Sequence, residues 1–366
     1  MRFPEFSGEW VTKSINDLAV VIGGGTPDTT VKSYWDGEIQ WFTPSEIGKN
    51  KYVDSSLRTI TEVGLNNSSA KLLPPNTILL SSRATIGECS LSLRECATNQ
   101  GFQCLVSKKC NVDFLYYLIQ TKKKDLIRKS CGSTFLEISA NEVRKIQVSV
   151  PSDVEQQKIA ELLSLIDERI ATQNKIIEDL KKLKSAISER LFKSVKGSTV
   201  LLSDLCDIVK GKQINGENLS DSGNYYVMNG GTEPSGYYDN YNVEASTISI
   251  SEGGNSCGYV QFNTSPFWSG GHCYSIQNIA DKVDNMYLYH YLKSNEDAIM
   301  KLRIGSGLPN IQKKDLAMFK IIVPKIEWQI KISTFLSSLE RKAEIEERIQ
   351  NVMQKQKLYL LQQMFI

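Results

Sequence analysis

The sequence is poor in histidine and has no closely spaced cysteine pair. It holds 2 histidines and 8 cysteines in 366 residues, and no two cysteines form a Cys-x-x-Cys pair. Structural zinc sites need clustered cysteine and histidine ligands, so we expect no metal site. Scattered cysteines are typical of buried, reduced thiols in a cytoplasmic protein, and the cytoplasm is the location that we expect.

The sequence also lacks a long apolar run and a large net charge. No apolar stretch approaches the ~20 residues that span a bilayer, and the first ten residues lack the apolar core of a signal peptide. We therefore expect no membrane association. The formal net charge is +2, from 43 Lys and Arg against 41 Asp and Glu. Because so small a charge gives no global basic field, any binding of nucleic acid must use local patches.

Motifs of nucleotide-binding and catalytic sites are missing as well. Neither Gly-Lys-Ser/Thr nor Gly-x-Gly-x-x-Gly follows the glycines at 23–25. The Asn/Asp-Pro-Pro-Tyr/Phe tetrapeptide of methyltransferases is absent. The acid–base run at 155–158 has no upstream Pro-Asp on a strand, which favours a solvated helical turn over a nuclease site. We expect no catalytic residue and no enzymatic activity from this chain alone.

One long stretch, 151–192, carries the clearest pattern. After its initial proline it contains no further proline or glycine, and its apolar residues alternate steps of four and three. Gln173 and Lys184 fill the two vacant places of this seam. A sustained heptad seam predicts a helix that packs along a partner helix. Its seam residues are Ile159, Leu163, Ile166, Ile170, Ile177, Leu180, Ile187 and Leu191.

The partner helix is predicted within the same chain, because the passage recurs 173 residues later without a gap. Gln156 returns as Gln329, and Phe192 returns as Phe365. The short link of 196–202 between the first helix and the following domain favours antiparallel pairing. We expect two helices with one globular unit at each end, related by a pseudo-two-fold axis. A homodimeric coiled coil is the alternative.

The residues that precede each helix are predicted to form a β-rich globular unit. In the first unit, 15–22, 39–43 and 101–106 read as strands, 78–87 as a strand that runs into a polar loop, and 114–127 as a helix. The second unit keeps this framework but has different loops. Since loops on a shared scaffold hold the differences in binding, we expect the two units to perform different versions of one task.

Together, the repeat of a domain followed by a helix and several short sequence motifs resemble the specificity subunit of type I restriction–modification systems, over essentially the whole chain. The motifs are Phe-Pro-Glu-Phe-Ser-Gly-Glu-Trp at 3–10, Gly-Gly-Thr-Pro at 24–27, and the segments 79–87, 97–102 and 150–156. The second copy departs from the first in two places. Trp328 replaces Glu155, and the loop 251–255 lacks the basic residue present at Arg83.

The resemblance implies an α+β fold with two β-rich target recognition domains, 1–151 and 197–324. Two helical spacers, 152–196 and 325–366, would form an antiparallel intramolecular coiled coil. Each recognition domain would read one half of a bipartite sequence in double-stranded DNA. The helices would set the spacing and dock two copies of the methyltransferase subunit.

The resemblance also implies how the chemistry is divided among subunits. The methyltransferase subunit would carry S-adenosylmethionine, and a restriction subunit would complete the complex. This chain would bind no cofactor of its own. A coiled-coil adaptor without DNA specificity is the alternative function.

Candidate contact residues come from the loops and from the outer helix faces. Polar and basic loop side chains supply phosphate and base contacts in protein–DNA complexes, and we expect such contacts from Thr26, Lys49, Arg83, Thr85, Gln100, Lys212, Asn229, Asn255 and Lys301. Apolar side chains beyond the need of one seam are expected to bind methyltransferase helices, namely Ile176, Leu183, Ile345 and Ile349. The aromatics Trp41, Trp268 and 287–291 are expected in the core.

Overall fold

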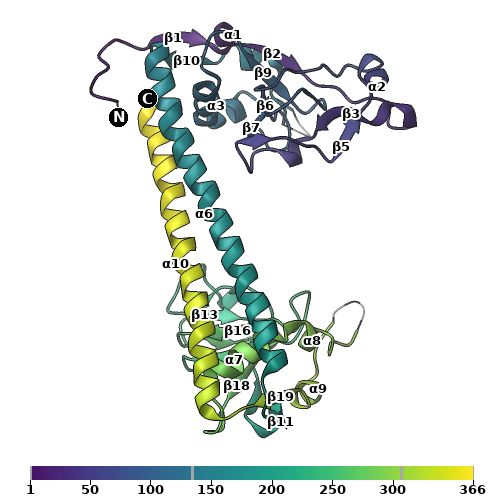
Figure 1. The fold of residues 1–366 in the computed structure, drawn as a ribbon, viewed down its shortest axis with the longest axis vertical. Helices are drawn as coiled ribbons and strands as arrows, with labels where there is room; N and C mark the ends of the chain where they lie inside the picture. The colour runs from purple at the N-terminus through teal and green to yellow at the C-terminus, as the bar shows by residue number, and fades with distance from the viewer. Residues whose placement is uncertain (1, 133–135, 306, 308, 366) are drawn as a thin grey trace. The chain divides into compact units, whose positions relative to one another are not determined.

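A computed structural model describes residues 2–132, 136–305, 307 and 309–365. The chain divides into two units, of which the first comprises 1–174 and 349–366 and the second 175–348. Each unit combines a sheet-rich domain with one segment of each long helix (Figure 1). No helix in the described ranges combines the length and the apolar character that crossing a membrane requires. The α+β fold with two sheet-rich domains and two long helices is thus confirmed.

Three sheets form the domain of the first unit. The largest has the strand order β2-β9-β6-β7-β4, the second has the order β5-β3-β8, and the third pairs β1 with β10. Their strands are β1 (Val11–Ser14), β2 (Ala19–Gly23), β3 (Trp35–Phe42), β4 (Tyr52–Val53), β5 (Arg58–Ile60), β6 (Ile78–Leu80), β7 (Cys89–Ser92), β8 (Cys96–Thr98), β9 (Gln103–Ser107) and β10 (Gln147–Val150).

The second unit repeats this plan. Its largest sheet, β12-β18-β15-β16, follows the order of β2-β9-β6-β7, and it is accompanied by β14-β13-β17 and by the pair β11-β19. Its strands are β11 (Ser198–Leu201), β12 (Asp207–Lys210), β13 (Tyr225–Met228), β14 (Tyr237–Tyr238), β15 (Thr247–Ser251), β16 (Val260–Asn263), β17 (Trp268–Ser269), β18 (Cys273–Gln277) and β19 (Lys320–Val323).

Short helices connect the strands in both units. The α-helices are α1 (Ile15–Leu18), α2 (Glu62–Asn66), α3 (Val112–Thr121), α4 (Lys123–Arg128), α5 (Ala140–Arg144), α7 (Asn285–Ser294), α8 (Glu296–Met300) and α9 (Lys313–Ala317). The 3-10 helices are η1 (Lys32–Tyr34), η2 (Pro44–Glu46), η3 (Leu202–Asp204) and η4 (Gly216–Asn218). The single helix expected over 114–127 is two helices, because Lys122 leaves the helical backbone region at φ −92°, ψ 7°.

The strand expected over 15–22 is wrong in its first half. Ile15–Leu18 forms the helical turn α1, and the strand β2 begins only at Ala19. The cause is local, since the Ser14 side chain accepts from the backbone N–H of Asp17 while the Asp17 carboxylate accepts from that of Ser14. This reciprocal capping box satisfies two free donors and starts a helix, which outweighs the strand propensity of the apolar residues.

The long helices are α6 (Asp153–Ser194) and α10 (Ile326–Met364), of 42 and 39 residues. In the first unit, Asp167 of α6 pairs with Lys357 of α10 at 2.6 Å, and Asn174 bonds to Gln350. From the first contact to the second, the chain advances seven residues on α6 and goes back seven residues on α10. This is the pattern of two antiparallel helices with heptad spacing. The prediction that the partner helix lies within the same chain is confirmed for this unit.

The second unit shows the same antiparallel pairing. Lys184 pairs with Glu340 at 2.6 Å and Lys181 pairs with Glu347 at 2.6 Å. Leu336 of α10 is fully buried, as is its counterpart Leu163 of α6 in the first unit. The repeat of 173 residues therefore holds in space as well as in sequence.

The main core of each unit joins its domain to its helix segments. In the first unit, Phe114 of α3 packs against Phe365 with ring centroids 5.2 Å apart. In the second, Phe192 of α6 lies 5.8 Å from Tyr287 of α7. Trp41 and the tyrosines at 287, 289 and 291 are buried as expected, whereas Trp268 is half-buried.

Most cysteines follow the expectation of burial, with one correction. Seven are buried, but Cys131 is exposed. It lies in the segment after α4, where its backbone bonds to Glu137 and its thiol contacts the carbonyl of Lys129. Burial raises the pKa of Cys89, Cys96 and Cys104 to about 12. Their thiolate forms are therefore disfavoured, which does not suit nucleophilic or metal-ligating roles.

Candidate functional site

The loops at one end of each large sheet hold most of the candidate polar side chains. In the first unit, β2 ends where β9 begins, since Gly23 is paired with Gln103, and the bridge of Ser81 to Phe102 brings the end of β6 to the same place. In the second unit, Lys210 at the end of β12 is paired with Tyr274, and Ser251 at the end of β15 with Cys273. The two sheet ends are therefore equivalent.

Four of the five candidates in the first unit lie on these loops. The Thr26 hydroxyl donates to the Gln100 side chain at 2.5 Å, across 74 positions of sequence. The guanidinium of Arg83 pairs with the carboxylate of Glu137 at 2.8 Å. Thr85 is exposed and donates to Ser81 at 3.2 Å. Candidates that are far apart in sequence thus meet at one sheet end.

The glycines of the first loop serve close backbone packing rather than a phosphate. A Cβ added at Gly24 would lie 2.0 Å from the carbonyl oxygen of Asn99. Its counterpart Gly211 would bring a Cβ within 2.2 Å of the carbonyl oxygen of Gly270. Only glycine permits this approach of two loops, and the same requirement recurs in both units.

The candidates in the second unit have different surroundings. Lys212 is exposed, and its carbonyl accepts from the Trp268 indole at 2.9 Å. Asn229 uses its side-chain oxygen to accept from the backbone N–H of His272 at 3.1 Å. Asn255 is exposed in the loop after β15, and Lys301 follows α8. Asn229 thus holds a neighbouring loop in place.

Sequence reasoning missed a charged cluster at the same sheet end. The buried carboxylate of Glu252 pairs with Lys210 at 2.6 Å and lies 3.8 Å from the ring of His272. The Tyr274 hydroxyl donates to the same carboxylate at 3.1 Å. Lys210, Glu252 and the neighbours His272 and Tyr274 come from three separate segments of the sequence, and the strand register brings these segments together.

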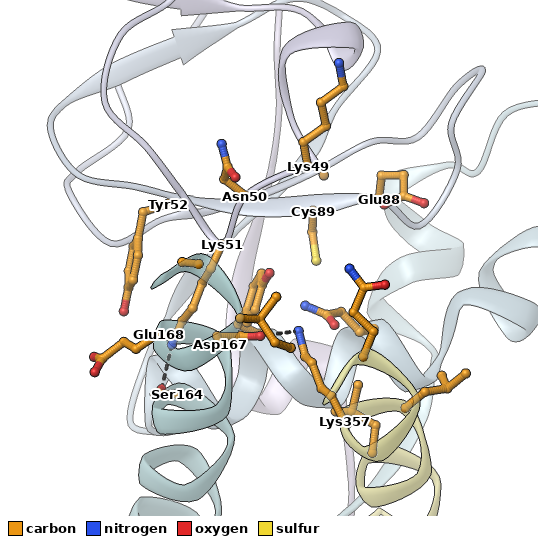
Figure 2. A pocket seen from close by; sticks show the side chains of 18 of the residues that line it. Lys49, Asn50, Lys51, Tyr52, Glu88, Cys89, Ser164, Asp167, Glu168 and Lys357 are labelled. Carbon is orange, nitrogen blue, oxygen red and sulfur yellow. Dashed lines mark hydrogen bonds and ion pairs between the residues drawn. The ribbon is translucent and has the colours of Figure 1, made fainter. Parts of the chain in front are cut away.

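A cavity of about 620 Å³ lies in the first unit where the domain meets the helix segments (Figure 2). Lys51, whose side chain is 7% exposed, pairs there with Asp113 at 2.6 Å and donates to Ser164 at 2.7 Å. Lys357 pairs with Asp167 across the same space, and the candidate Lys49 also lines the cavity. The bond of Lys51 to Ser164 thus joins the domain to α6, and the ion pair of Lys357 with Asp167 joins α10 to α6.

A buried glutamine fastens each helix start to its domain. Gln156 accepts from the backbone N–H of Asn111 at 3.1 Å and donates to the carbonyl of Pro151. Gln329 accepts from the backbone N–H of Asp284 at 2.9 Å and donates to the carbonyl of Pro324. Asn111 and Asp284 directly precede the equivalent helices α3 and α7. The contact between domain and long helix is therefore the same in both copies of the repeat.

The four outer-face apolar candidates are exposed to solvent. Their exposed fractions are 40% for Ile176, 50% for Leu183, 47% for Ile345 and 39% for Ile349. Binding of a partner at these positions stays a prediction. Within the described part of the chain, no group of three or more His, Cys, Asp or Glu side chains could hold a metal ion.

Comparison with known proteins gives a consistent result. The family described as type I restriction modification DNA specificity domain matches residues 7–182 and again 196–355. The MjaIX specificity subunit of Methanocaldococcus jannaschii is 39% identical over 180 residues, 48% of this chain and 42% of the relative. The EcoprrI specificity subunit of Escherichia coli is 25% identical over 352 residues, 87% of this chain and 84% of the relative.

A solved structure shares the fold. The S subunit of the type I restriction–modification system of M. genitalium aligns with a TM-score of 0.66 at 18% identity, over 100% of this chain and 99% of that one. The chain spans less than half the length of the MjaIX subunit, although it spans most of the EcoprrI subunit. Since the family matches both halves of the sequence, the chain belongs to the type I restriction–modification DNA specificity family.

Proposed function

We propose that this chain is the sequence-specific DNA-binding subunit of a type I restriction–modification complex. One observation supports the proposal most strongly. Two units share a strand order and a sheet end, yet they present different side chains there, Arg83 paired with Glu137 in one and Lys210 paired with Glu252 in the other. Equivalent scaffolds with different loops suit the reading of two different half-sites.

In this proposal the chain itself performs no chemistry. Each domain reads one half of a bipartite target in double-stranded DNA, and the helices set the distance between the halves. The methyltransferase subunit, in two copies, binds S-adenosylmethionine and transfers the methyl group, and a restriction subunit cleaves. The exposed apolar side chains Ile176, Leu183, Ile345 and Ile349 are proposed to contact the methyltransferase helices.

A mobility-shift assay with the purified chain and its methyltransferase subunit tests this function. We expect one duplex sequence to bind at least ~10³-fold more tightly than unrelated duplexes, the lower bound for specific DNA-binding proteins. Equal affinity for every duplex would favour the coiled-coil adaptor. Methylation or cleavage by the purified chain alone would contradict a non-catalytic role.

A further inference from the structure

Three equivalent positions hold different residues in the two large sheets, and two of them differ in charge. The register places Gly23 opposite Gln103 in the first unit and Lys210 opposite Tyr274 in the second. The third position follows β6 or β15, where the N–H of Ser82 bonds to the carbonyl of Gly101 and that of Glu252 to the carbonyl of His272. The positions of the two sheets are therefore matched by their backbone hydrogen bonds and not by sequence similarity.

The second unit fills these positions with a bonded, charged network. Lys210 pairs with one oxygen of Glu252 at 2.6 Å, and the Tyr274 hydroxyl donates to the same oxygen at 3.1 Å. The other oxygen of Glu252 is buried and has no hydrogen-bond partner among the described residues. The first unit has the uncharged residues Gly23, Ser82 and Gln103 at these positions, so the network distinguishes the two units.

Two members of the network reach solvent while their anchors are buried. The side chains of Lys210 and His272 are 54% and 62% exposed, against 9% for Glu252. Bonds from Glu252 and Asn229 hold the backbone of His272 at its carbonyl and its N–H. The ammonium of Lys210 and the backbone that carries the imidazole of His272 are therefore held in fixed positions.

The charge of the pair favours contact with a base over contact with phosphate. Lys210 and Glu252 together have no net charge, and such a pair exerts little attraction on the DNA backbone. A fixed ammonium with free N–H donors instead suits acceptors on a base edge. Guanine N7 and O6 in the major groove are the usual partners of lysine.

We propose that Lys210 and His272 contact acceptor atoms on base edges of duplex DNA, and that the buried Glu252 is the positioning residue for both, through its carboxylate for Lys210 and through its backbone N–H for His272. This inference rests on the proposed function and assigns one half of the target to one cluster. The loop 251–255, which lacks a counterpart of Arg83, thus contributes through a carboxylate that orients Lys210.

Selection from a library of duplexes with randomised sequence tests the inference with the full chain and its methyltransferase subunit. The variants are Lys210→Gln, His272→Gln and Glu252→Gln, and the control is Lys320→Gln, which removes an exposed lysine of β19 in the same unit. The wild-type chain should enrich two separated segments. Lys210→Gln and His272→Gln should lower base preference about 5- to 150-fold in one segment only, the range for one good side-chain contact to a base.

The unaffected segment reports that each variant is folded and binds DNA. Glu252→Gln should weaken preference at the same bases as Lys210→Gln, and the double variant should be no worse than Lys210→Gln alone. A general loss of stability would not give this base-specific, non-additive pattern. Lys320→Gln should leave both segments unchanged.

Three outcomes would overturn the inference. Unchanged preference in both segments for Lys210→Gln and His272→Gln would remove these residues from the interface. An equal loss of affinity for all duplexes, with a weaker dependence on salt, would mark a phosphate contact. Failure of the wild-type chain to enrich any sequence would overturn the proposed function as well. The first two outcomes would overturn only the inference.

Discussion

The carboxylate of Asp167 and the ammonium of Lys357 lie 2.6 Å apart, and the same distance separates Glu340 from Lys184. Glu340 lies 173 positions after Asp167, and Lys184 lies 173 positions before Lys357. Each carboxylate also accepts from a tyrosine of its domain, Tyr117 at 2.7 Å or Tyr289 at 3.1 Å. In an antiparallel pair of repeated helices, the acidic position of one copy faces the basic position of the other, and the reverse holds at the equivalent site. The two ion pairs therefore show how the helix copies are aligned.

Removal of either partner from this ion pair should destabilise the first unit. Asp167→Ala and Lys357→Ala should each lower the free energy of unfolding by about 1–3 kcal/mol, because a mostly buried charge loses its partner. The double variant should lose less than the sum of the two. Urea denaturation of all three variants measures the coupling. The exposed pair of Glu178 and Lys182 serves as a control with little effect, and strict additivity would show that the ion pair contributes nothing.

The buried seam leucines should be costly to truncate in both units. Leu163 and its counterpart Leu336 are fully buried, and replacement of either by alanine should cost about 2–5 kcal/mol. Leu165 is 63% exposed on the same helix, so Leu165→Ala is the matched control with a small effect. Denaturant midpoints compare the three. A small loss for Leu163→Ala would mean that the helix segments are not packed as described.

Histidine at position 290 should make stability depend on pH. Burial lowers the pKa of His290 from 6.5 to about 4, so the folded chain keeps the ring neutral while the unfolded chain takes up a proton. The contribution is present above pH 6.5 and is lost as the pH falls toward 4, by about 3 kcal/mol at most. Thermal unfolding across this range should show the decline. His290→Gln should remove most of it, and an unchanged pH dependence would contradict the assignment.

The architecture was more accessible from sequence than the binding surface. The helix pair followed from a gapless repeat and a heptad seam, both of which depend on local spacing. The turn at Ile15 was missed because one capping pair, Ser14 with Asp17, decided it. The contact of Thr26 with Gln100 and the cluster around Glu252 join residues far apart in sequence. Such contacts depend on strand register, which loop composition does not specify.

The outer helix faces should affect assembly without affecting folding. Leu183→Gln and Ile345→Gln change side chains that are 50% and 47% exposed, so the free energy of unfolding should change by no more than about 0.5 kcal/mol. Co-purification with the methyltransferase subunit should fall sharply if these side chains lie at its interface. Lys342→Gln, at an exposed position of α10, is the control. Retained co-purification of both variants would place the interface elsewhere.

The central claim is that two unlike domains of one chain direct modification to a two-part DNA sequence. A genome-wide map of methylated bases, in cells with the chain and in cells from which it is deleted, tests this claim most directly. We predict methylation at two short, different sequence segments separated by a gap of fixed length, and its loss on deletion. Methylation within one uninterrupted sequence, or a pattern that persists without the chain, would contradict the account.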